Sequence, residues 1–403
     1  MERFTGSFTQ QEPIPEAAIE AAVAVMRHGR LHRYNAAPGE VAEAALLEEE
    51  FAALTGARYC LALASGGAAM TTALRASGVQ AGDRVLTNAF TLAPVPGAIA
   101  AVGAVPEYVE TTEDLVIDLN DLQAKLGRAR ILLLSHMRGH LCDMTRLMAL
   151  CDAAGVTVIE DCAHTMGAAW DGVPSGRRGA MGCFSTQTYK HANSGEGGLL
   201  IGDDPQAMAR AVILSGSYML YGRHTAAPPE EAFAEVRLTT PNVSSRMDNL
   251  RAAILRPQLR TLDDRVDRWN ALYRTMEAGL ADTPALSLVP RPGAEAFVGS
   301  SIQWRLPDWP EAAVREMLAR CAARGVELKW FGDPEPRAFT SRYDSWRYAP
   351  VPSLPRTDRV LAGLIDMRLP LTFTPDDVAL IARIVRAETS AVWQAGAGVG
   401  ART

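Results

Sequence analysis

The sequence has little of what marks a membrane, secreted or nucleic-acid-binding protein. No apolar run approaches the length that crosses a bilayer, and the first residues, Met1 to Gly6, hold no cationic segment leading into an apolar stretch. The formal net charge of −6 provides no basic surface for nucleic acid. We therefore expect a cytoplasmic protein with neither a membrane nor a nucleic-acid partner.

The cysteine pattern gives no sign of a metal site or of disulfides. The six cysteines include no Cys-x-x-Cys pair, and the spacings of a zinc site are absent, so we expect no metal and reduced, buried thiols. The chain shows no internal repeat and no heptad run. With 403 residues, 48% hydrophobic and 21% charged, it has the composition of a globular protein with a substantial core.

Short apolar runs alternate with amphipathic stretches through the first two-thirds of the chain. Runs without polar alternation suit strands that are covered on both faces, and strand–helix–strand order favours a parallel sheet. The sequence predicts an α/β fold, mainly a parallel sheet sandwiched by helices. The expected strands span residues 59–64, 84–87, 131–135, 156–161, 182–185 and 199–202.

The remaining third predicts a smaller α+β domain. We expect one long helix over 248–278, a strand over 300–306, and helices over 311–324 and 375–388. The expected domains are 1–255 (an N-terminal segment and the large domain) and 256–394 (the small C-terminal domain). Small residues dominate 395–403, which predicts a disordered tail.

A turn of small residues, Ser65-Gly66-Gly67-Ala68, follows the first expected strand and precedes a helical pattern. Backbone N–H groups at such a helix start can point at an anion, which the helix dipole also favours. Tight packing of strand against helix is the more common reason for small residues at such a turn. The turn by itself leaves both interpretations open.

Asp161 ends an otherwise apolar strand. Ligands of open α/β sheets bind at the carboxyl ends of the strands, where a carboxylate could pair with a protonated ring nitrogen. Asp161 could instead cap the following helix.

Lys190 lies in a polar loop between two apolar runs, with Ser185 five positions before it and a glycine-rich turn, 195–198, five positions after it. A loop lysine is ordinarily a solvated surface charge. Held next to an aldehyde cofactor, however, a desolvated lysine is a neutral nucleophile that forms an imine.

Together these motifs resemble the DegT/StrS aminotransferases, which are fold-type-I pyridoxal-phosphate enzymes, many of them aminating nucleotide-linked keto-sugars or related cyclic ketones. The similarity extends from about His28 to the C-terminal helix. It rests on the following segments: Val158–Ala168, Gly182–Ser185, Lys190, Gly195–Gly198, Ala81–Val85, Ser245–Ala253 and Arg368–Leu371.

The resemblance implies a role for each matched residue. Lys190 would form the Schiff base with pyridoxal 5′-phosphate and later move a proton, Asp161 would keep the pyridine nitrogen protonated, and His164 would lie against the ring. The phosphate would be bound by Ser185 and by the turn of Ser65, Gly66, Gly67 and Ala68. Asn242 or Ser244 would reach the cofactor phosphate of a neighbouring subunit, which implies a homodimer with active sites at the subunit interface.

The chain departs from the family pattern at several positions. Gly67 stands where a threonine hydroxyl is usual, and Leu92 aligns with the aromatic that commonly stacks on the cofactor ring, so either Leu92 or Phe90 faces the ring. The stretch 223–238 has the character of an exposed insertion that shapes substrate access.

Near the N-terminus, Arg33 and Tyr34 match a segment that lines the substrate cleft in the family, which makes them candidate substrate contacts. A solvated turn is the alternative. The acidic run Glu48-Glu49-Glu50 predicts one face of an exposed helix.

The function that follows is amino transfer, with glutamate or glutamine as donor, to a keto- or aldehydo-sugar, possibly nucleotide-linked, or a related cyclic ketone. One alternative is a dehydratase or eliminase with the same cofactor, against which Lys190 argues because such relatives tend to carry histidine there. Another is a non-catalytic regulatory or binding protein with the same fold.

Overall fold

The structure is a computed structural model that describes residues 2–400, and its largest element is a seven-stranded sheet. Six of its strands run in the same direction, while β9 runs antiparallel to its neighbours β1 and β8. The predicted fold class and all six predicted strands are therefore confirmed. In spatial order the strands are β1 (Tyr59–Leu63), β9 (Gly198–Gly202), β8 (Met181–Ser185), β5 (Thr157–Asp161), β4 (Ile131–Ser135), β2 (Arg84–Asn88) and β3 (Val105–Val109).

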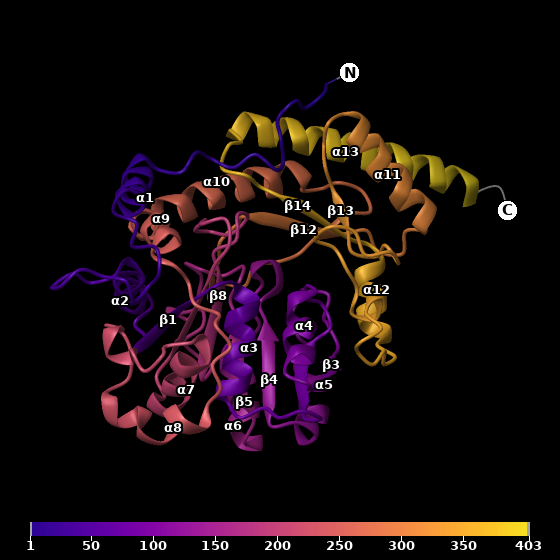
Figure 1. Ribbon diagram of the computed structural model, residues 1–403. Helices are drawn as coiled ribbons and strands as arrows, with labels where there is room; N and C mark the ends of the chain where they lie inside the picture. The colour runs from indigo at the N-terminus through magenta and orange to yellow at the C-terminus, as the bar shows by residue number, and fades with distance from the viewer. Residues whose placement is uncertain (1, 401–403) are drawn as a thin grey trace.

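Helices cover both faces of this sheet because its strands are apolar on both sides (Figure 1). Along β1, Leu61 and Leu63 pack on one face, while Cys60 and Ala62 pack on the other. The first face is covered by α3 (Gly66–Ala76), α4 (Pro94–Ala101), α7 (Pro205–Ser215) and α8 (Phe233–Thr239). The second is covered by α2 (Glu43–Thr55), α5 (Leu119–Lys125), α6 (Met144–Ala154) and α9 (Asn249–Leu259).

A second, antiparallel sheet lies beyond the carboxyl ends of the parallel strands (Figure 1). Its strand order is β10 (Ser287–Leu288), β12 (Ser301–Arg305), β14 (Leu364–Arg368) and β13 (Lys329–Trp330). The helices α10 (Leu262–Leu280), α11 (Glu311–Ala323) and α13 (Pro375–Gly400) share a hydrophobic core with this sheet, α12 (Pro355–Ala362) directly precedes β14, and α1 (Glu16–His28) packs on α9. The division of the chain near residue 255 remains a prediction, because β11 (Glu295–Ala296) pairs with β6 (Ala169–Trp170), which in turn pairs with β7 (Val173–Pro174).

Two expectations about this region were wrong. The single helix expected over 248–278 is two helices, α9 and α10, separated at Arg260 and Thr261. The disordered tail expected from residue 395 is helical through Gly400, and residues 401–403 lie outside the described part. The helix has acidic residues, Asp376 and Asp377, in its first turn, and the buried Ile381 and Val385 anchor its earlier turns. Because those turns are anchored, the helix can continue into its glycine- and alanine-rich end.

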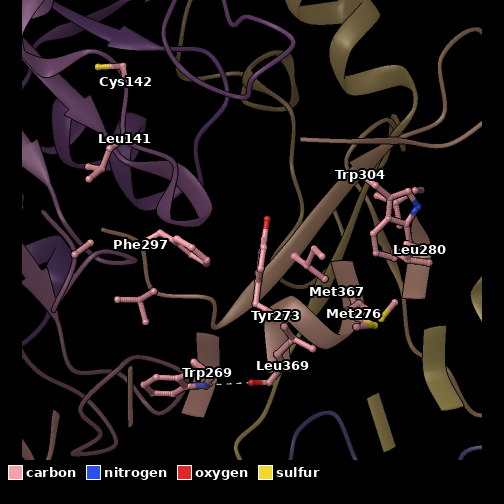
Figure 2. Close-up of a cluster of buried hydrophobic side chains, with 14 of the residues drawn as sticks. Leu141, Cys142, Trp269, Tyr273, Met276, Leu280, Phe297, Trp304, Met367 and Leu369 are labelled. Carbon is pink, nitrogen blue, oxygen red and sulfur yellow. Dashed lines mark hydrogen bonds between the residues drawn. The ribbon is translucent and has the colours of Figure 1, made fainter. Parts of the chain in front are cut away.

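The core of the second sheet fixes the end of β14. Trp269 and Tyr273 of α10 pack with Trp304 and Met367, and Trp269 Nε1 donates a hydrogen bond of 3.1 Å to the Leu369 carbonyl (Figure 2). The indole therefore anchors the backbone directly after the last residue of β14.

The N-terminal segment, expected with the large domain, packs on the other end of the chain. Phe4 and Phe8 each lie 5.0 Å from Phe373, ring centroid to ring centroid, and edge-to-face. The Phe4 amide also donates to the Arg324 carbonyl at 2.9 Å. Within residues 2–400, no helix has the length and apolarity needed to cross a membrane.

Candidate functional site

A cavity of about 670 Å³ opens at the carboxyl ends of the parallel strands, between the large sheet and β14. This is the edge of an α/β sheet at which ligands bind. The predicted residues that line it are Ser65, Gly66, Gly67, Leu92, Asp161, His164, Ser185 and Lys190. Residues from segments far apart in the sequence thus meet at one place.

The start of α3 forms one wall of this cavity. Ser65 caps the helix, its Oγ accepting a 3.0 Å hydrogen bond from the Ala68 amide. Because the first N–H groups of a helix have no partner within it, the amides of Gly66 and Gly67 can bind an anion such as a phosphate. The Ala68 amide, which we predicted would join them, is already used by Ser65.

Gly66 of this turn and Gly198 of the adjacent β9 are required by space. A Cβ added to Gly66 would lie 2.8 Å from the Ser185 Cβ, and one added to Gly198 would lie 2.3 Å from the Ser65 carbonyl oxygen. The close approach of Ser185 to the turn brings its hydroxyl beside the same free amides. The tight-packing interpretation of this turn is therefore confirmed, and anion binding by it stays a prediction.

Asp161 is buried at the end of β5 and faces the cavity. Its Oδ2 accepts a 3.0 Å hydrogen bond from Ser135 Oγ, which accepts in turn from Thr91 Oγ1 at 2.9 Å, and its Oδ1 accepts from the Ala163 amide. Burial raises the pKa of this carboxyl group, and the nearby Lys190 opposes that rise. A protonated ring nitrogen at this position would stabilise the carboxylate.

The neighbouring Glu160 points to the opposite face of β5, as strand alternation requires. Its carboxylate accepts hydrogen bonds from the amides of Gly176, Arg178 and Gly179 and lies 2.8 Å from Nε2 of His136. His136 is therefore a buried structural residue. Together with Cys162 these side chains approach one another closely enough for metal ligands, but the carboxylate oxygens already have their partners.

Lys190 projects into the cavity and its Nζ lies 2.8 Å from Nε2 of His164. Burial, helped by the positive charge of Arg138, lowers the pKa of the amine to about 7. Burial likewise holds the pKa of His164 well below its usual range, so the imidazole is neutral. The lysine is thus a nucleophile rather than a solvated surface charge.

The structure shows which of Leu92 and Phe90 faces the cavity. Leu92 lines the cavity, whereas Phe90 is 1% exposed and packs edge-to-face on Phe331, 5.1 Å away. The ring contact predicted for Phe90 is therefore not available, because its side chain belongs to a core cluster.

Arg33 and Tyr34 do not line the cavity. The Arg33 guanidinium is 2% exposed and makes two hydrogen bonds to Glu48, at 2.8 and 2.9 Å, while Tyr34 Oη lies 2.8 Å from His224 Nε2. Substrate contacts by these two groups in this chain are not supported, since their polar atoms are already paired inside the protein. The exposed face expected for Glu48 was also wrong, whereas Glu49 is exposed.

Asn242 is exposed and lies away from the cavity, where its Oδ1 accepts from the Ser244 amide at 2.9 Å. The predicted insertion 223–238 is not an open loop over the site. It forms α8, whose Phe233 stacks on Tyr221 with ring centroids 4.1 Å apart.

Several cavity residues were not predicted as site residues from the sequence. Arg138 follows β4, Tyr189 precedes Lys190, and Arg368 ends β14, while Trp346 comes from the segment between β13 and α12. The position of Arg138 shortly after a predicted strand could have identified it as a site residue. Nothing in the sequence indicated that Arg368, some 180 residues after Lys190, would face the same cavity.

The family model of the DegT/DnrJ/EryC1/StrS aminotransferases matches residues 14–386. The chain belongs to this family. It is 31% identical over 300 residues to an L-glutamine:2-deoxy-scyllo-inosose aminotransferase from Streptomyces kanamyceticus, an alignment that covers 73% of this chain and 69% of the relative. It is 33% identical over 238 residues to a dTDP-3-amino-3,4,6-trideoxy-alpha-D-glucose transaminase from Micromonospora megalomicea subsp. nigra, covering 58% of this chain and 60% of that relative.

Among solved structures, the aminotransferase TlmJ from Streptoalloteichus hindustanus superposes with a TM-score of 0.82 at 23% identity, covering 95% of this chain and 99% of that one. This similarity independently supports the fold.

Proposed function

We propose that the protein is a pyridoxal-phosphate-dependent aminotransferase that moves an amino group from glutamate or glutamine to the carbonyl carbon of a keto-sugar or related cyclic ketone. Family membership and the activities named for its relatives support amino transfer to this class of acceptor. The observation in the structure that carries the proposal is the buried amine of Lys190, with its pKa lowered to about 7, which lies 2.8 Å from His164 in a cavity shared with Asp161.

The residues present fit pyridoxal phosphate. The free amides of Gly66 and Gly67 and the hydroxyl of Ser185 form a cradle for a phosphate, which a Cβ at Gly66 would disturb. Asp161 supplies a carboxylate for the ring nitrogen, and Leu92 supplies an apolar wall. When bound, the cofactor supplies an aldehyde carbon for amino exchange and a ring that delocalises electrons from the reacting carbon.

Side chains of the protein would orient the cofactor and move protons. The Thr91–Ser135 hydrogen-bond chain fixes Asp161, so that its charge stays aligned with the ring nitrogen. Lys190 Nζ, whose pKa of about 7 leaves a substantial neutral fraction near pH 7, would take a proton from the substrate carbon and deliver it to the carbon on the other side of the transferred nitrogen. His164 Nε2 holds Nζ in position between these steps. Donor and acceptor use the same cavity in turn, which predicts ping-pong kinetics.

The direct test is spectroscopic. Purified protein loaded with pyridoxal phosphate should absorb in the visible, and glutamate or glutamine should bleach that band, with a keto-sugar or cyclic ketone restoring it. Borohydride reduction followed by peptide mass spectrometry should place the cofactor mass on Lys190, and Lys190→Ala should abolish it. If no amino donor bleaches the band, amino transfer is overturned. Covalent attachment elsewhere would overturn the Lys190 assignment.

We further infer that the enzyme works as a homodimer in which Asn242 reaches the partner's cofactor phosphate. Asn242 is exposed, lies outside this chain's own cavity, and is followed by the exposed Val243; Tyr218 and Met219 are exposed apolar residues on the preceding loop. Exposed apolar side chains of this kind mark interaction surfaces. The left-handed backbone of Tyr218, Met219 and Ser244 would gain support from such an interface.

Mixed dimers test this arrangement. Lys190→Ala and Asn242→Asp should each be nearly inactive, but a hybrid of the two has one site with both wild-type residues. Co-refolded hybrids should therefore recover a substantial part of the activity of one site. Light scattering would report the dimer directly. Absence of recovery in verified hybrids would place Asn242 in its own chain's site or in none.

The cytoplasmic location is supported by the chemistry of the thiols. All six cysteines are buried and unpaired, a state that reducing compartments maintain.

A further inference from the structure

Two arginines face the same cavity as Lys190, Arg138 from the end of the large sheet and Arg368 from the second sheet. Arg138 follows β4 in a left-handed backbone conformation (φ 55°) and is 6% exposed, and Arg368 is the partly buried last residue of β14. Lys329 of β13 adds a third positive charge nearby, and burial lowers its pKa to about 8. This wall is therefore strongly cationic.

One carboxylate, Asp366, compensates part of this charge. Its Oδ2 lies 3.0 Å from Arg138 Nη2, and its Oδ1 accepts a 2.7 Å hydrogen bond from Gln303. Asp366 also faces Lys329 across the β13–β14 pairing. Within the described part of the chain, Arg368 forms no salt bridge of its own, so the wall retains excess positive charge.

The position of Arg368 is fixed next to the reactive amine. Its guanidinium carbon lies 3.8 Å from the ring centroid of Tyr189, the residue before Lys190. Trp269 holds the backbone directly after Arg368 through the Leu369 carbonyl (Figure 2). A guanidinium stacked on an aromatic face keeps its N–H donors in the plane of the group, where they can bind a carboxylate in a bidentate manner.

We propose that Arg368 is a carboxylate subsite that binds the carboxylate of the amino donor, with Arg138 held by Asp366 as the supporting charge. This inference rests on the proposed function. The donor carbon that gives its proton to Lys190 carries a carboxylate one bond away, so the group that recognises it must lie beside Lys190. An acidic acceptor could offer the same chemistry, and the test separates the two sources.

We expect that the amino acceptor does not need to contact Arg368. Arg368 is only partly buried, so water can solvate it when a neutral cyclic ketone occupies the cavity. The same cavity can thus accept an amino acid in one half-reaction and a neutral ring in the other. The subsite gives specificity to the donor step alone.

The experiment uses the cofactor-loaded enzyme and glutarate, which has the carboxylates of glutamate but no amine to react. Calorimetry should show glutarate binding to wild type and roughly 10–100-fold weaker binding to Arg368→Gln, the loss expected for a charged hydrogen-bonded contact. Arg368→Lys, which keeps the charge without the fork, should recover part of the affinity. Arg320→Gln, on the exposed face of α11, makes the same change in net charge and should bind glutarate as wild type does.

Half-reaction kinetics then identify the source of the carboxylate. In Arg368→Gln, the donor half-reaction should show a raised KM, while the KM for a neutral keto-acceptor should change less than twofold. An effect confined to the acceptor would overturn the donor assignment, and unchanged glutarate affinity would overturn the subsite. An intact visible band and unchanged melting temperature verify folding. Failure of all donors to bleach the band in wild type would instead count against the proposed function.

Discussion

Lys190 Nζ lies 2.8 Å from His164 Nε2, and burial lowers the pKa of both groups, that of Lys190 to about 7 and that of His164 to well below its usual range. His164 is therefore neutral near pH 7, where a substantial fraction of Lys190 bears no proton and can attack a carbonyl carbon. The contact joins the turn after β5 to the β8–β9 loop, and the burial of Lys190 determines the pH range in which the enzyme can be loaded.

Cofactor loading should depend on pH through Lys190. The pKa of this amine is about 7, so the nucleophilic fraction rises as the pH increases through 7 and is nearly complete one unit higher. The rate of visible-band formation on adding pyridoxal phosphate to apoenzyme should follow that curve. A midpoint near 10.5, the ordinary value for lysine, would contradict the assigned environment.

Gly66 and Gly67 should differ sharply in their tolerance of a side chain. Gly66→Ala places a Cβ 2.8 Å from the Ser185 Cβ, and overpacking of this kind costs about 1–3 kcal/mol. Titration of apoenzyme should therefore show cofactor affinity weakened by ~5–150-fold. Gly67→Ala is the matched control, because its Cβ would meet only Ser65 Oγ at 3.7 Å, and its affinity should stay near wild type. Equal effects at both positions would contradict the predicted geometry.

Substitutions of Leu92 and Phe90 should affect different properties, the cofactor affinity and the melting temperature respectively. Leu92→Ala removes a cavity wall and should weaken cofactor affinity with a small change in melting temperature. Phe90→Leu removes an edge-to-face contact with Phe331 worth about 0.5–1.5 kcal/mol, and should lower the melting temperature while leaving the cofactor spectrum unchanged. Thermal unfolding and absorbance titration of both variants provide the comparison. The reverse pattern would place Phe90 at the ring.

Glu48 should be important for stability, unlike its neighbour Glu49. Glu48→Gln leaves the buried Arg33 guanidinium without its counter-charge, and breaking a buried pair in this way costs about 3–5 kcal/mol. Denaturant unfolding should show that loss, whereas Glu49→Gln, on the exposed side of α2, should stay within about 0.5 kcal/mol of wild type.

The Glu48 carboxylate should also make the free energy of unfolding depend on pH. Burial raises the pKa of Glu48, but Arg33 and His224 outweigh that and hold it at about 2 in the folded protein, below the value of about 4.3 in an unfolded chain. Its contribution is therefore present above pH 4.3 and is lost as the pH falls from there toward 2. Wild type should lose more stability over this range than Glu48→Gln. Parallel pH profiles would contradict the ion pair.

The sequence by itself determined the sheet and the order of the site motifs. Continuous apolar runs such as Ile131–Ser135 can be satisfied only between two layers of helices, and a polar residue at the end of such a run, as with Asp161, must emerge at the carboxyl edge. Strand β3 was missed because Pro106 and Glu107 interrupt its apolar pattern. Local composition was enough for these elements because burial of a strand depends mainly on its own residues.

Only the tertiary structure decided which polar groups remain available to a ligand. Arg33 and Arg368 are both arginines in family-matched segments, but Arg33 meets Glu48 in the interior, whereas Arg368 stacks on Tyr189 at the cavity. Phe90 and Leu92 are two residues apart, and only Leu92 reaches the cavity. Which charges pair and which rings pack is decided by where helices and loops bring residues together in space, as with Phe90 and Phe331, and the spacing along one chain does not encode those distances.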